Sequence, residues 1–425
     1  MKFTPATLLA FFKSETAAWG LVLSWVGIIL AVVPHGRKIQ HYVSSHFGSV
    51  WFLYFTLACL ALALLAVALV WWRARKPVLP NGVFWLAIVS GAGAVIACNL
   101  SSEESVHLVQ YGVLAGLVLR AVFYRIHDAS AYLITASWCF IFGSVDEFVQ
   151  WLIPGRCFDF RDIRLNAFGS CLVLIGMAGV FRPAFLQRRP TVFSVRYTAA
   201  LALICLTVVM AMLSNTAKTI RSCVELFPKT KFLMGCDEVM AEFGFLHNDP
   251  RIGRFKSRFT RKQLISIDAS SGKALGKILR QYKEKSEYHN FLLQYTPLSD
   301  PFLHEARVRL FRRDEFLKSG LDKLSWDEIG ASADFGVALK ENFIMEKYCP
   351  HLLKSSACEL DNELRAFLFS EAELRMDYVS PVSRSLITNF TLRQAAVVYI
   401  MAVAVLLVLQ EMLVRRLRKN WQNLK

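Results

Sequence analysis

Residues 131–169 read AYLITASWCFIFGSVDEFVQWLIPGRCFDFRDIRLNAFG and join an apolar run to a dense group of polar residues. The apolar part, 131–145, is long enough to form most of a membrane-spanning helix, which needs about 20 residues. Asp146, Glu147 and Gln150 then close the run. An ionisable group within a span is costly unless it is paired or faces water. The stretch therefore predicts a helix that crosses a membrane and ends in a polar site.

The composition of the whole chain indicates a polytopic membrane protein. Of the 425 residues, 55% are hydrophobic and 19% are charged, whereas soluble domains carry about 25% charged residues. Eight candidate spans are expected at residues 16–33, 50–72, 83–99, 105–124, 130–153, 164–182, 196–213 and 394–414. We predict an all-α polytopic transmembrane helix bundle with a mainly α-helical soluble insert. Counts of seven or nine spans stay open.

The net charge of +16 follows the loops between the predicted spans. Basic residues gather after spans two, four and six, and at the C-terminus as Arg415, Arg416, Arg418 and Lys419. The loops on the other side are poorer in Lys and Arg, so the positive-inside rule places both termini in the cytoplasm and residues 214–393 outside. This distribution explains the charge without nucleic acid. We expect a multi-pass protein of the inner or plasma membrane whose partners are membrane lipids.

Five regions follow from this pattern. They are 1–82 with an N-terminal pair of transmembrane helices, 83–182 with a transmembrane core, 183–213 with a linker and the seventh helix, 214–393 with an extracytoplasmic soluble domain, and 394–425 with the eighth helix and a basic cytoplasmic tail.

The soluble insert is expected to be mostly helical. Apolar residues at helical spacing and helix start signals predict helices at 273–285, 301–320 and 361–379. Ser325 is expected to cap a further short helix, with Glu328 three residues later as in a capping box. The run LISID, residues 264–268, is the one expected strand.

Four of the ten cysteines lie in the insert and are the disulfide candidates Cys223, Cys236, Cys349 and Cys358. An even number in an extracytoplasmic domain favours two disulfides. Of the three possible pairings we prefer the local one, Cys223 with Cys236 and Cys349 with Cys358. Four reduced thiols are the alternative. No pair has the CxxC spacing of a zinc or redox motif.

Polar residues near the outer ends of spans four, five and six are expected to face one another. Those in span four are spaced i, i+3 and i+7, and those in span five i and i+3, so each set shares one helical face. Asp162, near the start of span six, is expected to cap that helix. Besides His107 and Glu147, the expected binding residues of this outer-leaflet site are Glu104, Tyr111, Gln150, Arg156, Asp159, Asp162 and Asn166.

The same residues carry a resemblance to a known family. DEFVQWLIPGRCFDFRDIRLNAFG, 146–169, resembles the VanZ-like signature of an acid and a glutamine on a helix, Pro-Gly-Arg, two aspartates and an Asn-x-x-Gly helix start. EESVHLVQYGVLAG, 103–116, resembles the earlier motif of that family. The resemblance covers about 83–182 and implies functional roles for His107, Glu147, Gln150, Arg156, Asp159, Asp162 and Asn166. The family is named for a protein linked to teicoplanin resistance, so it implies a cell-envelope protein that affects glycopeptide susceptibility.

Three interpretations of the predicted site stay open. In an enzyme, His107 would be the catalytic acid or base and Glu147 would orient it or act itself, on an envelope lipid or a lipid-linked cell-wall component held by Arg156. A binding or masking site would hold such a component without chemistry. A structural cluster would only lock three helices, in a scaffold that presents the soluble domain. Asp159 and Asp162 could join Glu147 around a hard cation, but their spacing matches no standard motif, and we assign no metal and no cofactor.

The insert contains one basic stretch, residues 242–264, with six Lys and Arg side chains. It could contact an anionic surface or polymer, but we favour a solvated loop whose Phe245, Phe255 and Phe259 pack inward. No catalytic motif is found in the insert. The segment that begins at His304 lacks the HExxH spacing of a zinc protease.

Overall fold

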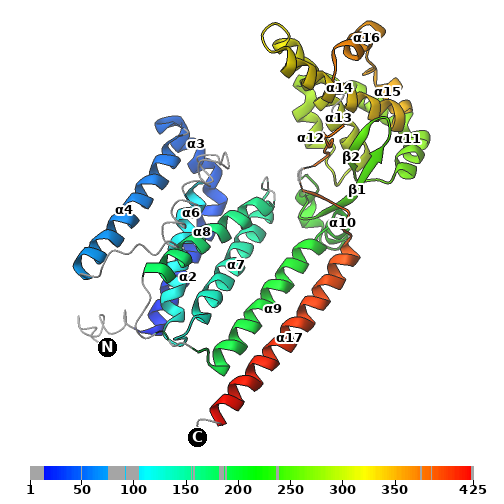
Figure 1. Cartoon of the computed structure of the whole chain (residues 1–425). Helices are drawn as coiled ribbons and strands as arrows, with labels where there is room; N and C mark the ends of the chain where they lie inside the picture. The colour runs from blue at the N-terminus through cyan, green and yellow to red at the C-terminus, as the bar shows by residue number, and fades with distance from the viewer. Residues whose placement is uncertain are drawn as a thin grey trace. The chain divides into compact units, whose positions relative to one another are not determined.

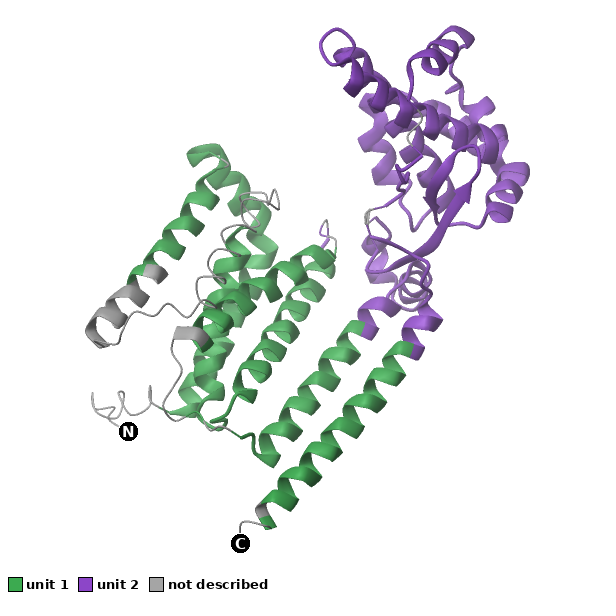
Figure 2. Ribbon diagram, in the orientation of Figure 1, with its two compact units in different colours: residues 1–153, 158–209, 398–425 green, residues 154–157, 210–397 purple. Residues whose placement is uncertain are grey.

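The computed structural model describes residues 14–48, 50–74, 91, 105–154, 156, 158–180, 186, 189–235, 239–373, 376–383 and 385–422. The chain divides into two compact units, which Figure 2 distinguishes by colour. Unit 1 comprises residues 1–153, 158–209 and 398–425, and unit 2 comprises residues 154–157 and 210–397.

Unit 1 is helical, and most of its helices are long and apolar (Figure 1). Their bounds are α2 Glu15–Val32, the 3-10 turn η1 Val33–His35, α3 Gly36–Phe47, α4 Trp51–Ala74, α6 Ser105–Val122, α7 Ser130–Trp151, α8 Phe160–Val180, α9 Val192–Ser214 and α17 Leu392–Gln422. The final residues of α9 and the first residues of α17 belong to unit 2.

Membrane-spanning character is clear in the described residues. Five helices there are long and apolar enough to cross a membrane, namely Glu15–Phe47, Ser105–Val122, Ser130–Trp151, Val192–Ser214 and Leu392–Asn420. The predicted all-α polytopic bundle is confirmed, and the chain is a multi-pass membrane protein. The expected span 83–99 lies outside the described residues except for residue 91.

Side-chain hydrogen bonds join neighbouring helices of unit 1. The indole nitrogen of Trp138 on α7 donates to the Tyr197 hydroxyl on α9 at 3.0 Å. The hydroxyls of Thr207 on α9 and Tyr399 on α17 are 3.1 Å apart, and Figure 1 shows these two helices side by side. The buried centre of the bundle is formed largely by α6, through Tyr111, Leu114, Ala115, Val118 and Leu119.

Unit 2 packs helices around a small sheet. Its elements are α10 Ala217–Leu226, η2 Pro228–Gly235, β1 Glu242–Asp249, β2 Gly253–Ser257, α11 Arg261–Gln281, η3 Lys285–Glu287, α12 Tyr288–Gln294, α13 Pro301–Lys323, α14 Glu328–Tyr348, α15 Pro350–Ser356, α16 Asn362–Glu371 and β3 Leu386–Thr388. The strand order is β2-β1-β3, with β1 antiparallel to β2 and parallel to β3. Phe255 of β2 is fully buried and packs with residues of α11, α13 and α14.

Local signals explain where the helices of unit 2 begin, and they correct two predictions. Thr260 forms a capping box with Gln263 and starts α11, so the expected strand 264–268 is wrong and those residues are helical. Asp327, rather than Ser325, caps α14, because its side chain accepts a hydrogen bond from the Gly330 amide at 3.0 Å.

The cysteines of the insert also differ from the preferred pairing. Cys223, Cys349 and Cys358 are free thiols, and Cys236 lies outside the described residues. Cys349 is 5% exposed and packs into the apolar core, while the Cys358 thiol lies 3.5 Å from the Ser356 carbonyl. A disulfide between Cys349 and Cys358 is therefore not formed in this structure.

Candidate functional site

Polar side chains from α6, α7 and α8 meet inside unit 1. We call them the α6–α8 polar cluster and define it as His107, Tyr111, Asp146, Glu147, Gln150, Asp159, Asn166 and Ser170. Most of these side chains are buried, whereas His107 and Asp159 are partly exposed. Polar groups at membrane depth are tolerated when they satisfy one another, and most of the polar groups in this cluster do so across three helices.

The link between α6 and α7 is made by Tyr111 and Asp146. The Tyr111 hydroxyl donates to the Asp146 carboxylate at 3.0 Å, and both side chains are almost fully buried. Gly143 lies one turn earlier on α7, where a Cβ would be in van der Waals contact with Tyr111 and Asn166 at 3.4 Å. This small residue lets the polar groups of the three helices approach.

The link between α6 and α8 is made by His107 and Asn166. Nδ1 of His107 lies 3.0 Å from Oδ1 of Asn166, which is 1% exposed. Ser170, one turn further along α8, donates to the Asn166 carbonyl at 2.9 Å and lies 3.3 Å from the Tyr111 carbonyl. Asn166 Nδ2 is buried and has no hydrogen-bond partner among the described residues.

Glu147 is the most enclosed carboxylate of the cluster, with no solvent exposure. It accepts hydrogen bonds from Gln150 Nε2 at 3.1 Å and from the Asp159 amide at 3.4 Å. Asp146, Asp159 and Asp162 all act on it electrostatically. The site is therefore rich in acids, which favours a ligand that presents hydrogen-bond donors or positive charge.

The structure places the predicted site residues unevenly. It brings His107, Tyr111, Glu147, Gln150, Asp159 and Asn166 together, whereas Glu104 lies outside the described residues. Arg156 belongs to the short segment that groups with unit 2. The hydrogen-bond partner of the His107 ring in the described part of the chain is Asn166, so Glu147 does not orient His107 directly.

The start of α8 differs from the expectation for Asp162. Asp159 immediately precedes the helix and accepts a hydrogen bond from the Arg161 amide at 2.7 Å. Asp162 instead lies in the first turn, where a negative charge suits the helix dipole. The capping contact thus belongs to Asp159.

Two cluster members, Asp146 and Ser170, are absent from the predicted set. A signal for each exists in the spacing, because Asp146 is four residues before Gln150 and Ser170 four residues after Asn166. A metal centre has no support within the described ranges, where no group of three His, Cys, Asp or Glu side chains is placed to hold an ion.

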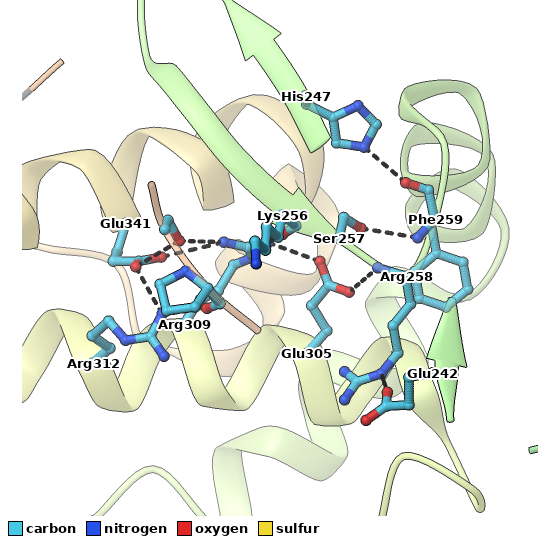
Figure 3. Close-up of polar contacts among 12 residues, drawn as sticks. Glu242, His247, Lys256, Ser257, Arg258, Phe259, Glu305, Arg309, Arg312 and Glu341 are labelled. Atoms are coloured by element: carbon cyan, nitrogen blue, oxygen red, sulfur yellow. Dashed lines mark hydrogen bonds and ion pairs between the residues drawn. The ribbon is translucent and has the colours of Figure 1, made fainter. Parts of the chain in front are cut away.

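Unit 2 contains a second set of buried charges, shown in Figure 3. Arg309 lies between Glu305 at 2.9 Å and Glu341 at 3.4 Å, and Arg312 contacts Glu341 at 3.2 Å. Ser380 donates to Glu341 at 2.7 Å. Buried charges of this kind are tolerated when each has a partner, and this network joins α13 and α14 to the segment before β3.

The basic stretch 242–264 forms the hairpin β1–β2 and the start of α11 rather than a loop. Phe255 points into the core, but Phe245 is 42% exposed. Arg258 pairs with Glu242 at 2.5 Å, as Figure 3 shows. This stretch is largely a structural part of unit 2.

His304 begins the segment that lacks the HExxH spacing. Its side chain is buried, and this burial together with the charge of Arg258 lowers its pKa to about 3. A ring with so low a pKa stays neutral near neutral pH. Unit 2 therefore offers no histidine acid or base at this position.

Comparison with known proteins assigns a family to the N-terminal part of the chain. Residues 3–182 match the family described as VanZ/LLP1, a range that includes α6, α7 and α8 and reaches back beyond the expected start at residue 83. No curated protein and no solved structure matches the chain. The family match and the apolar helices together show that residues 3–182 are a VanZ-like region of a membrane protein.

Proposed function

We propose that the VanZ-like region binds an envelope lipid or a lipid-linked cell-wall component at the α6–α8 polar cluster. One observation carries this proposal: Asn166, held by His107 at 3.0 Å, keeps a buried Nδ2 that no described residue satisfies. Folded proteins satisfy most such groups, so a buried donor without a partner among the described residues is available to a ligand.

The chemistry of the cluster suggests which part of a ligand it holds. Glu147 and its acidic neighbours would accept hydrogen bonds from hydroxyl, amide or amine groups of a headgroup. His107, partly exposed at the edge of the cluster, would make first contact. An ordinary phospholipid tail would occupy the surrounding apolar helix surface.

The position of the cluster in the cell is part of the proposal. The basic loops and C-terminal tail support cytoplasmic termini, with the cluster near the outer leaflet and residues 214–393 outside. Protease added to intact cells should then cut the soluble segment. Sequestration of a cell-wall precursor at this position would alter glycopeptide susceptibility.

The binding proposal is tested with the purified full chain in detergent. The assay measures thermal stabilisation by fractionated envelope lipids and lipid-linked precursors for wild type, His107→Ala and Thr135→Val. Thr135 is a matched control, because it is fully buried on α7 and its hydroxyl, among the described residues, donates to the Ala131 carbonyl of its own helix. We expect one fraction to stabilise wild type and Thr135→Val but not His107→Ala, since bound ligand raises the melting temperature by mass action.

Two other outcomes of this assay would support the enzyme or the structural interpretation instead. A fraction whose components are chemically changed after incubation with wild type would show an enzyme. No stabilisation by any fraction, with all three proteins folded, would leave the cluster a structural lock and the chain a scaffold for unit 2.

A further inference from the structure

Unit 2 begins with a short helix that follows a membrane span almost at once. α9 ends at Ser214 and α10 starts at Ala217. The 23 residues of α9 extend about 34 Å at 1.5 Å per residue, close to the hydrocarbon thickness of about 30 Å. Three residues of extended chain reach at most about 11 Å. The first turn of α10 therefore lies within reach of the lipid headgroups at the end of α9.

This segment is fixed to the body of unit 2 on one side. Ile220, in the middle of α10, is 1% exposed, and Nε of Arg221 donates to the Leu298 carbonyl at 3.0 Å. Further along, Thr296 donates to the Met234 carbonyl in η2 at 2.8 Å. The side chains that α10 and η2 expose are thus held in defined positions.

The exposed side carries two large apolar groups. Leu226 is 75% exposed and Phe227 is 62% exposed, at the junction between α10 and η2. The backbone at this point is ordered by a 2.8 Å hydrogen bond from the Phe227 amide to the Cys223 carbonyl. Single exposed apolar residues are common, but an adjacent pair on a rigid support favours a partner.

Basic residues surround this apolar pair. The segment 217–231 contains one acid, Glu225, and the basic residues Lys218, Arg221, Lys229 and Lys231, all of them exposed. Apolar side chains next to Lys and Arg, on a short amphipathic helix, are the pattern of segments that lie in the membrane interface. Anionic headgroups would attract this charge.

We propose that α10 and the start of η2, residues 217–231, form an interfacial anchor that inserts Leu226 and Phe227 among anionic phospholipids of the leaflet where α9 ends. Lys229 and Lys231 would contact the lipid phosphates. This lipid contact is separate from the α6–α8 polar cluster and does not depend on its function.

A second exposed apolar patch in unit 2 differs from residues 217–231 in the charge that surrounds it. Trp326 is 72% exposed and Ile329 is 83% exposed at the turn between α13 and α14. The adjoining residues 320–330 contain three acids, Asp322, Asp327 and Glu328, and one base, Lys323. This net negative charge opposes contact with an anionic membrane. The charge around each patch therefore selects residues 217–231 as the lipid-facing one.

The test uses the full chain in nanodiscs with p-benzoylphenylalanine at Phe227. The matched control has the same photo-crosslinker at Phe369, which is also an exposed phenylalanine of unit 2, on α16. Mass spectrometry after illumination counts lipid adducts in nanodiscs with phosphatidylcholine alone and with phosphatidylglycerol added. We expect adducts at Phe227, enriched in phosphatidylglycerol, and few at Phe369.

The charge is tested by Lys229→Gln with Lys231→Gln in the Phe227-labelled protein. Each lysine removed should lower the preference for the anionic lipid by about fivefold, the effect of one basic residue near a charged surface. Equal numbers of lipid adducts at the two labelled positions would overturn the anchor. Photo-crosslinks from position 227 to protein, with none to lipid, would also overturn it. Equal capture of both lipids, unchanged by the lysine substitutions, would overturn its anionic specificity.

Discussion

Replacing Gly169 with alanine should force α6 and α8 apart at the polar cluster. A Cβ added at this glycine would lie 3.0 Å from the Leu108 Cα and 3.1 Å from the Leu108 carbonyl oxygen. Both are backbone atoms that cannot rotate away. Restoring an ordinary contact of at least 3.4 Å requires the helices to separate by a few tenths of an ångström, and strain of this kind costs about 1–3 kcal/mol.

The matched control is Gly116→Ala on α6, where an added Cβ meets no atom within 4 Å. Both substitutions gain about 0.5–1 kcal/mol of helix propensity, so the difference between the two variants isolates the strain. We expect Gly169→Ala to be less stable than Gly116→Ala by about 1–3 kcal/mol.

The assay is reversible unfolding in mixed micelles, followed by circular dichroism, with ligand stabilisation measured on the same samples. The same shift would lengthen the 3.0 Å contact between His107 and Asn166, so the Gly169 variant should also bind less ligand. Equal unfolding free energies for the two alanine variants would refute the close helix approach on which the site depends.

Three further predictions concern unit 2. Burial tends to raise the pKa of Asp249, but hydrogen bonds from Lys347 and Tyr348 outweigh it and lower the pKa to about 2. Because the folded-state pKa is lowered, its stabilisation is present above pH 3.8 and is lost as the pH falls toward 2. Asp249→Asn should remove about 2 kcal/mol at neutral pH and flatten this dependence, measured by hydrogen exchange of the full chain. Thr260→Ala should destabilise α11 by about 1 kcal/mol through loss of its capping box, seen as faster exchange of its first turn. Cys349 is a buried free thiol whose pKa is raised by burial, so it should react with maleimide only after the protein unfolds. This reaction should need no added reductant, because the thiol is not in a disulfide.

The spans and several helices could be predicted from the sequence because their signals are local. The apolar run 130–153 corresponds to α7 at Ser130–Trp151, since a chain in lipid must satisfy its backbone within one helix. The helix expected from residue 301 begins there, with Asp300 as its cap. Hydrophobic length and capping chemistry are sufficient for elements of this kind.

The pairing of β1 with β3 could not be predicted because the two strands are far apart in the sequence. β1 pairs with β3, and Glu242 of β1 lies opposite Leu386 at a separation no local pattern reveals. The run 264–268 has the β-branched residues of a strand, but the capping signal at Thr260 makes it the first part of a helix. Local chemistry at the helix start thus overrides strand propensity.

The membership of the site was predictable in part, and the pairing of its residues was not. The spacing identified His107, Glu147 and Asn166 as residues that face a common region. The contacts among these side chains depend on how closely α6, α7 and α8 approach and how each helix is rotated. The small residues Gly143 and Gly169 lie where the helices approach. His107 therefore meets Asn166 rather than the expected Glu147.

The most direct test of the central claim is native mass spectrometry of the full chain, purified gently from its own membranes. Wild type, Glu147→Gln and the control Thr135→Val are compared at equal protein amounts. We expect one copurifying envelope lipid or lipid-linked precursor on wild type and Thr135→Val, and its loss from a folded Glu147→Gln. The same lipids in the same amounts on all three proteins would contradict a ligand site at the α6–α8 polar cluster.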